Sequence, residues 1–212
     1  MDWRCIGSKW AYLWNDNFEN VDGVQALVAE VLATEMDAID KNIWHGATSS
    51  GNFLGIVPQL SATASGAIKT TATASVTYTN VLGEIDKFLR TVPTAVKNGE
   101  HRFVISPDIA DALVSAQALG QITYGQMVTD TQFKFGRYTL EVVDNLNDRT
   151  MLFYNVKNLV LGTGLKSDFN TLFIDSGSSE RIKDGTAIIK MVYTAGTAVV
   201  RPSEVAIYSP NV

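Results

Sequence analysis

The chain has 212 residues, of which 46% are hydrophobic and 18% are charged, and its formal net charge at pH 7 is −5. This length allows one large domain or two small ones, and the acidic excess argues against a protein that grips duplex DNA through Lys and Arg. The single cysteine, Cys5, excludes an internal disulfide. No apolar run approaches the roughly 20 residues of a membrane span, and no secretory signal is recognisable, so we expect a soluble cytoplasmic protein.

The first twenty residues are rich in aromatic side chains, namely Trp3, Trp10, Tyr12, Trp14 and Phe18. Large aromatic residues usually contribute by burial, which favours packing of this segment against the helix that follows. Tryptophan and tyrosine are also enriched at interface hot spots, which favours docking on a neighbouring subunit. The sequence leaves both interpretations open, and Trp3, Trp10, Tyr12 and Trp14 are the candidate subunit-interface residues.

A long amphipathic helix is predicted over residues 22–45. Apolar residues recur there at steps of three and four, and acidic residues such as Glu35 fall on the other faces. Gly46 follows the last periodic residue, where a helix commonly ends in a left-handed conformation. The predicted apolar face consists of Val24, Leu27, Val28, Val31, Leu32, Met36, Ile39 and Ile43.

After this helix the sequence predicts a loop, a strand and a second helix. Three glycines punctuate the irregular loop predicted over 46–60, which follows a helix and lacks the lysine and spacing of a phosphate-binding P-loop. Residues 71–78 alternate in polarity and are rich in β-branched side chains, which predicts a strand. Helical spacing returns over 81–90, and Pro93 is expected to end that helix or to restart it one turn later.

The middle of the chain reads as strands around one helix. A strand at 102–105 leads into Ser106 and the following Pro-Asp, which are typical of a helix N-terminus. The polar turn 145–149 is predicted to join two strands, 139–143 and 150–154, as a hairpin.

The C-terminal quarter is predicted as further β-structure. It begins with a strand over 158–161, continues with a long β pair over 187–200 that is broken at Ala195 and Gly196, and closes with a short strand over 205–208. No internal repeat is present. These elements predict an α+β fold with a long helix and a mostly antiparallel sheet.

No motif points to catalysis or to a cofactor. His45 and His101 lack metal-ligand spacing to each other and to Cys5. The acidic turn 144–148 lacks the central glycine and the closing glutamate of an EF-hand. Nucleophile-elbow, dinucleotide-binding and zinc-protease motifs are absent from the sequence. We therefore predict no catalytic, cofactor-binding or metal-binding residue and no enzymatic activity.

The order of the segments resembles the major capsid protein of tailed bacteriophages, which has the Hong Kong 97-type fold. The helix at 22–46 looks like the spine helix of that family, and ATSSGNFLGIV after it is similar to the family's glycine-punctuated loop. HRFVISPDIADALVSAQ resembles its strand, Pro turn and helix, and RYTLEVVDNLNDRTMLFYNVKNLVLG its strand pair. The C-terminal strands of the family are similar to GTAIIKMVYTAGTAVVRPSEVAIYS. Together these segments extend the resemblance over residues 22–212.

The resemblance implies a structural subunit that self-assembles into pentamers and hexamers of an icosahedral shell. Such a shell forms in the bacterial host cytoplasm, becomes part of the virion and encloses DNA with only non-specific proximity to it, without cofactors or membranes. The implied domains are an N-terminal segment at 1–21, a peripheral domain at 22–80 and 181–202, and an axial domain at 81–180 and 203–212.

The chain departs from the family in one respect. An N-terminal arm and an extended loop precede the spine helix in that family, whereas about twenty residues precede it here. We therefore expect either a truncated, assembly-deficient form or a reduced arm at the Trp-rich start. Two other interpretations stay open: an encapsulin-type nanocompartment shell protein, and a small α+β enzyme or binding module with a cleft beside residues 46–55.

Overall fold

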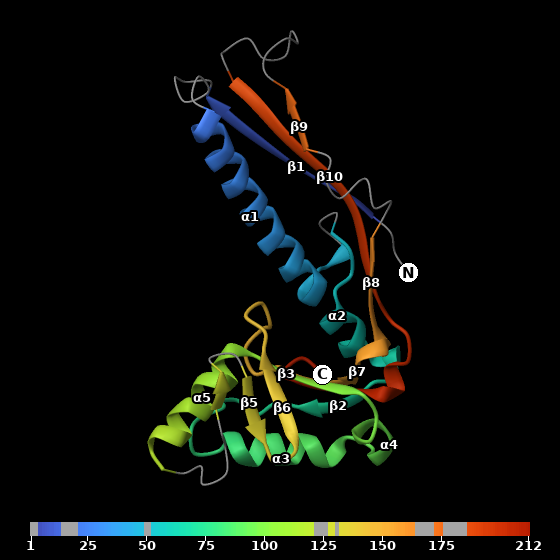
Figure 1. Ribbon diagram of the computed structural model, residues 1–212. Helices are drawn as coiled ribbons and strands as arrows, with labels where there is room; N and C mark the ends of the chain where they lie inside the picture. The colour runs from blue at the N-terminus through green and yellow to red at the C-terminus, as the bar shows by residue number, and fades with distance from the viewer. Residues whose placement is uncertain are drawn as a thin grey trace. The chain divides into compact units, whose positions relative to one another are not determined.

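The computed structural model describes residues 4–13, 21–48, 52–120, 127–129, 132–163, 172–175 and 186–212. The chain divides into two compact units (Figure 1). The first unit holds Met1–Leu54 and Leu161–Thr197, and the second holds Gly55–Val160 and Ala198–Val212. Within the described ranges, no helix is both long and apolar enough to cross a bilayer.

A long helix and a four-stranded sheet belong mainly to the first unit. They are α1 (Val21–His45), β1 (Arg4–Leu13), β8 (Leu159–Thr163), β9 (Leu172–Asp175) and β10 (Thr186–Val199). β10 lies between β1 and β8 in the sheet, and β9 also pairs with β10. β1 runs antiparallel to β10, from Arg4 opposite Ala195 to Leu13 opposite Thr186.

α1 confirms the predicted long helix and begins one residue earlier. Ile39 is buried in a cluster with Phe53 and Ala195, and Leu32 and Ile43 pack partly buried against that cluster. The apolar stripe of the helix therefore provides its packing surface, as the periodicity predicts.

Two predicted positions on α1 are wrong. Glu35, predicted on a polar face, is only 6% exposed, and Met36, predicted on the apolar face, is 46% exposed. Either residue fits the helical spacing between Leu32 and Ile39. Steps of three and then four residues lead through position 35, and steps of four and then three lead through position 36, and both paths follow the same face of a helix. Packing selects Glu35, so this stretch of the helix is rotated slightly from the predicted orientation.

α1 ends at the predicted residue but for a different reason. Gly46 does not have a left-handed backbone, and its N–H donates to the carbonyl oxygen of Asn42 at 2.9 Å. A Cβ atom on Gly46 would lie 2.2 Å from the carbonyl oxygen of Phe53. Glycine is required here because another stretch of backbone approaches closely, and not because of its conformational freedom.

The second unit is built on a seven-stranded sheet in the order β2-β11-β7-β3-β6-β5-β4. The strands are β2 (Ile68–Thr71), β3 (His101–Ile105), β4 (Met127–Thr129), β5 (Gln132–Phe135), β6 (Tyr138–Val142), β7 (Met151–Asn155) and β11 (Val205–Ser209). β2 and β11 are parallel, as are β3 and β6, while the other neighbours are antiparallel. This arrangement confirms the predicted α+β class with a mostly antiparallel sheet.

Helices pack on the sheet and close the main core. They are α2 (Ile56–Ser61), α3 (Val81–Thr91), α4 (Thr94–Lys97) and α5 (Pro107–Ala118), with 3-10 turns at Thr63–Ser65, Val156–Asn158 and Pro202–Glu204. α3 and α5 share a core with alternate residues of the sheet, and α2 lies on the opposite side of the sheet from α3 (Figure 1). Phe88 of α3 contacts Phe103 and Tyr208, with ring centroids 5.7 and 6.0 Å away. The predicted helices at 81–90 and after Ser106, the helix restart after Pro93 and the last strand are confirmed. The loop predicted over 46–60 is wrong in its last part, because Ile56, Val57 and Leu60 are buried on the helix α2.

The predicted hairpin of 139–143 and 150–154 is wrong. Both strands exist as β6 and β7, but β3 lies between them, parallel to β6 and antiparallel to β7. The connecting turn passes across the end of β3, where Val143 N–H donates to Ile105 and Ser106 N–H donates to Thr150. Residues 103–105 are buried on both faces of β3, and such a strand belongs in the centre of a sheet.

The predicted strand at 71–78 is displaced. The strand lies at Ile68–Thr71 and pairs with β11, whose last paired residue is Ser209. Beyond this point the chain turns, and Thr77 N–H donates to the side-chain oxygen of Asn80 at 2.7 Å. Local hydrogen bonds within this Ser/Thr-rich segment take the place of the strand-to-strand hydrogen bonds that the alternating polarity of its residues predicts.

The predicted break at Ala195 and Gly196 is also wrong. Residues 186–199 form one continuous strand, β10, and not a β pair. Its partners are β1, β8 and β9, all from other parts of the chain. An Ala-Gly dipeptide is tolerated inside this strand because neighbouring strands supply the pairing that a local hairpin otherwise provides.

Candidate functional site

The histidines do not form a metal site. Within the described residues, no three His, Cys, Asp or Glu side chains are grouped in a way that could hold an ion. His101 stacks on Phe153 with ring centroids 4.8 Å apart, and its Nδ1 lies 2.8 Å from the carbonyl oxygen of Gly99. These contacts give His101 a packing role at the start of β3.

The acidic turn is tied to the start of α5. Asp108 accepts a hydrogen bond from Arg149 N–H at 2.9 Å and another from the Ser106 hydroxyl. Thr150 N–H donates to Ser106 Oγ at 3.2 Å. Ser106 lies at the predicted N-cap position, but its side chain bonds these neighbours and does not cap a helix amide.

Arg149 joins three segments and has a strained backbone. Its φ of 58° is the only positive value of a non-glycine residue in the described part of the chain. Its guanidinium donates to the carbonyl oxygens of Ala74 at 2.7 Å and Thr73 at 3.4 Å. Such a conformation persists only where surrounding contacts impose it, and the bond to Asp108 and these carbonyls do so here.

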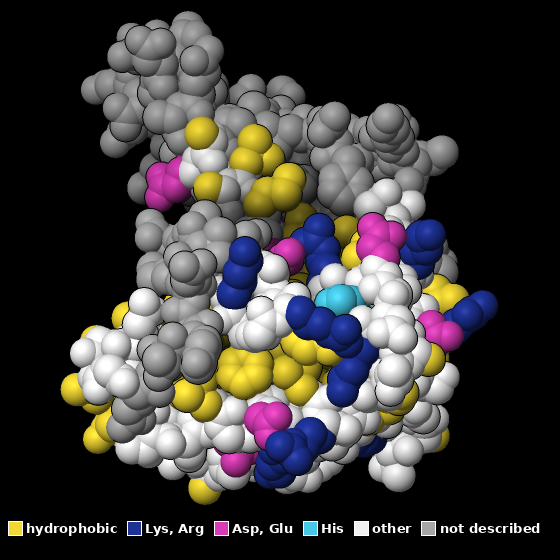
Figure 2. All heavy atoms as spheres, turned by 60° about the horizontal axis from the view of Figure 1, so that its bottom comes forward, with side chains coloured by type: hydrophobic (Ala, Val, Ile, Leu, Met, Phe, Trp, Pro, Cys, Tyr) yellow, Lys and Arg dark blue, Asp and Glu magenta, His cyan; other side chains and the backbone are white. Residues whose placement is uncertain are grey.

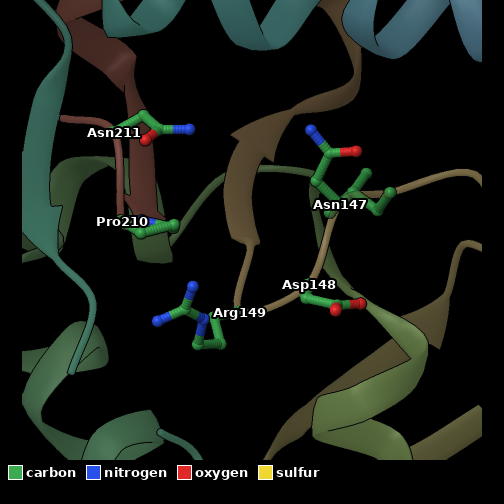
Figure 3. Close-up of a pocket in the computed structure, with 6 residues that line it drawn as sticks. Asn147, Asp148, Arg149, Pro210 and Asn211 are labelled. Carbon is green, nitrogen blue, oxygen red and sulfur yellow. The ribbon is translucent and has the colours of Figure 1, made fainter. Parts of the chain in front are cut away.

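A hollow of about 440 Å³ lies beside this turn. Figure 3 shows the Asp148 carboxylate and the Arg149 guanidinium pointing to different sides. None of the lining residues is a serine, cysteine, histidine or lysine, so the hollow offers no nucleophile beside a base. Its lining is Leu146, Asn147, Asp148, Arg149, Pro210 and Asn211. The convergent titratable groups expected of an active site are not gathered there.

The last strand is anchored by the phenol of Tyr208. The hydroxyl donates to Glu84 Oε2 at 2.7 Å and accepts from Thr73 N–H at 3.1 Å, so it links β11 to α3 and to the segment after β2. The side chain is fully buried, and burial raises the pKa of the phenol above its ordinary value, with a further contribution from Glu84.

Replacing Tyr208 with phenylalanine is expected to lower the free energy of unfolding of the second unit by about 2 kcal/mol at pH 7. The variant leaves Thr73 N–H without its acceptor and removes the closer of the two donors to Glu84 Oε2, the other being Lys87 Nζ at 3.4 Å. Because folding raises the pKa of the Tyr208 phenol, this phenol contributes less to the free energy of unfolding of the wild type as pH rises above the ordinary phenol value of 10.0. The variant has no phenol at this position, so it does not lose this contribution. Urea unfolding of both proteins at pH 7 and at about pH 10.5 should show a narrower gap at the higher pH. A gap that does not change with pH would contradict this account.

Two of the four candidate interface residues belong to β1. Trp10 is paired with Ile189 and Tyr12 with Ala187, both on β10. Trp3 and Trp14 lie outside the described residues. The pairing shows that the aromatic-rich segment contributes a strand to the sheet of the first unit, and its role at a subunit interface stays a prediction.

Basic side chains gather at one end of the second unit, where β3 and β6 begin and β5 and β7 end. Lys134 is near the end of β5, Arg137 precedes β6, Lys97 closes α4 and Lys157 follows β7. The Arg137 guanidinium lies 5.0 Å from the ring centre of Tyr138, whose ring lies 5.4 Å from that of His101. Figure 2 shows Lys and Arg side chains around a histidine on one face of the molecule.

We call Lys97, Lys134, Arg137 and Lys157 the basic end. This group is not apparent from the sequence, because only Lys134 and Arg137 are close in the chain and the four residues form no basic run. Only the sheet order brings them to a common end. No local signal in the sequence could have identified them as a set.

Comparisons with solved structures identify the fold. A search of family models finds no match, and a search of curated proteins finds none either. The capsid of an empty GTA particle is similar with a TM-score of 0.70 at 9% identity, covering 97% of this chain and 72% of that one. The procapsid of satellite phage P4 is similar with a TM-score of 0.62 at 12% identity, covering 98% and 70%. An encapsulin of Synechococcus elongatus PCC 7942 is similar with a TM-score of 0.60 at 11% identity, covering 99% and 74%.

Proposed function

We propose that this chain, which has the Hong Kong 97-type capsid fold, is a major capsid subunit that assembles into an icosahedral shell around phage DNA. The observation that carries the proposal is the full-length match to shell subunits, which spans both units and not only a common sheet motif.

The two units correspond in this proposal to the two domains of a capsid subunit. The first unit, with α1 and β10, serves as the peripheral domain, and the second, with its seven-stranded sheet, serves as the axial domain. Residues 55–80 belong to the second unit, because they include α2 and the β2 strand of its sheet. We therefore propose a division between the two domains near Gly55, where the sequence analysis expects one at residue 80.

Light scattering coupled to size exclusion, with negative-stain microscopy of the leading peak, tests the assembly role. Rings or closed shells formed by the purified chain are the expected result. A monomer at every concentration and salt condition tried would contradict assembly by this chain and would favour the assembly-deficient interpretation, while the fold assignment would stand.

The encapsulin alternative has its own support in the match to the Synechococcus elongatus shell. The contents of particles isolated from the native host distinguish the two functions. A capsid is expected to enclose nuclease-resistant DNA, whereas a nanocompartment is expected to enclose a protein cargo and little nucleic acid. Absorbance ratios and gel analysis of nuclease-treated particles make this measurement.

A further inference from the structure

The basic end differs from the rest of the described surface in lacking acidic partners. Within the described residues, Lys97, Lys134, Arg137 and Lys157 form no ion pair, although Arg137 donates to the Tyr138 hydroxyl. The other basic side chains described bond to carboxylates or to backbone carbonyls, namely Lys41, Lys69, Lys87, Arg90, Arg102, Arg149 and Arg201.

The acidic groups near the basic end are mostly engaged already. Glu141 binds Arg102 at 2.6 Å. Hydrogen bonds from Asn158 and then from Arg201 lower the pKa of the Glu204 carboxyl. Glu100 is exposed in the same region and compensates one of the basic charges. The end as a whole therefore keeps an excess of positive charge.

The opposite end of the same sheet is acidic. Asp111, Asp144 and Asp148, which we call the acidic end, are exposed beside the point where β3 and β6 finish and α5 begins. These three carboxylates form no ion pair within the described residues. The nearby cation, Arg149, directs its guanidinium to backbone carbonyls. The two ends are separated by the five residues of β3, roughly 15 Å, which exceeds the screening length of about 8 Å at physiological salt.

We propose that the basic end of the second unit docks against the acidic end of the second unit in another copy of this chain. This inference rests on the proposed shell function and specifies which surfaces meet. Head-to-tail contacts use two different surfaces of each subunit and generate a closed ring when the rotation closes. Opposite charges at the two ends supply both the attraction and the direction of such a contact.

The charge distribution disfavours two other arrangements. A two-fold symmetric contact through either end would place like charges against each other. Nucleic acid would engage the basic end through phosphates, but it would leave the acidic end without a role. Contact with a second copy accounts for both ends at once.

Charge-reversal variants of the full-length chain test the contact. Lys134 and Lys157 are exposed, so the double variant K134E/K157E reverses part of the basic end without touching the ring contact of Arg137. D111K/D144K reverses part of the acidic end and leaves the strained Arg149 and its neighbour Asp148 unchanged. Each variant alone is expected to lower the assembled fraction in sedimentation velocity by about tenfold or more.

Mixing is the decisive measurement. K134E/K157E has two acidic ends and D111K/D144K has two basic ends, so an equimolar mixture is expected to recover assembly as alternating rings. The quadruple variant, with both ends exchanged, is expected to assemble by itself. Failure of both the mixture and the quadruple variant to recover assembly, with circular dichroism showing folded chains, would overturn the proposal.

A matched control separates this contact from a general charge effect. K41E/K87E changes the net charge by the same amount at two residues that belong to neither end, Lys41 on α1 and Lys87 on α3, and is expected to assemble like the wild type. Equal loss of assembly in this control would overturn the proposal. A second result would also overturn the proposal. If K134E/K157E assembles normally but no longer binds a fluorescent single-stranded DNA, the basic end is assigned to nucleic acid. In both of these results the wild type still assembles, so the proposed shell function stands and only the proposed contact is overturned. A wild type that never assembles would contradict both the shell function and the contact.

Discussion

Replacing Phe88 with alanine is expected to lower the free energy of unfolding of the second unit by about 4 kcal/mol, because it removes a fully buried ring from the centre of the core. Phe88 is 0% exposed and contacts Phe103 on β3 and Tyr208 on β11. Phe103 in turn contacts Phe153, with ring centroids 5.6 Å apart. The cavity would therefore open between α3 and the strands β3, β7 and β11, where close packing prevents complete relaxation.

Hydrogen exchange measured peptide by peptide is the suitable test. The amides of β3 and β7 should exchange faster in the Phe88→Ala variant, by a factor that corresponds to the lost stability. Lys87→Ala, one residue away, is the control. Lys87 is half-exposed and its ion pair with Glu84, at 3.4 Å, lies at the surface, so the expected change is below about 0.5 kcal/mol. Similar exchange in the two variants would show that Phe88 does not support the core.

Replacing Gly46 with alanine is expected to destabilise the first unit by about 3 kcal/mol, because the new methyl group meets backbone on two sides. Its Cβ would lie 2.2 Å from the carbonyl oxygen of Phe53 and 2.6 Å from that of Asn42. Neither atom belongs to a flexible side chain. Relief of the clash requires the end of α1 to move away from Phe53, which packs against Ile39 and Ala195.

Gly83→Ala provides a control of opposite sign. Gly83 lies inside α3, and no atom lies within 4 Å of a Cβ built on it. Alanine there is expected to stabilise the helix by about 1 kcal/mol, because glycine has the lower helix propensity. Thermal unfolding of both variants, followed by tryptophan fluorescence and by circular dichroism, measures the two effects. Trp44, one of the four tryptophans of the chain, lies in α1. A Gly46→Ala variant as stable as the wild type would contradict the close approach of the two backbone segments.

The helices were predictable because their signals are local. Apolar spacing identified α1 and α3, and the Ser-Pro-Asp sequence at 106–108 identified the start of α5, all within a few residues of the observed bounds. Helical hydrogen bonds and caps join residues that are close in sequence, so the periodicity carries most of the information. The errors on α1 concern only which of two adjacent residues, Glu35 or Met36, faces the packing partner.

The strands were predictable as segments but not as partners. Residues 139–143 and 150–154 were recognised, yet the insertion of β3 between them was not, because pairing depends on residues distant in sequence. The continuous β10 was divided at Ala195 and Gly196 for the same reason. A polar turn or a small dipeptide resembles a hairpin locally, whereas burial of both faces of β3 is a property of the assembled sheet.

The surfaces proposed for assembly depended still more on tertiary structure. The four basic residues come from three separate segments, and the strand order brings these segments to one end, opposite the aspartates that follow β3 and β6. The segments are α4 with Lys97, the β5–β6 hairpin with Lys134 and Arg137, and the turn after β7 with Lys157. By itself the sequence determined the α+β class, the long helix and the resemblance to capsid subunits, because these depend on local periodicity and on the order of segments. The structure decided which strands are neighbours, why Gly46 must be glycine and which charges remain unpaired, because these depend on contacts between residues far apart in the chain.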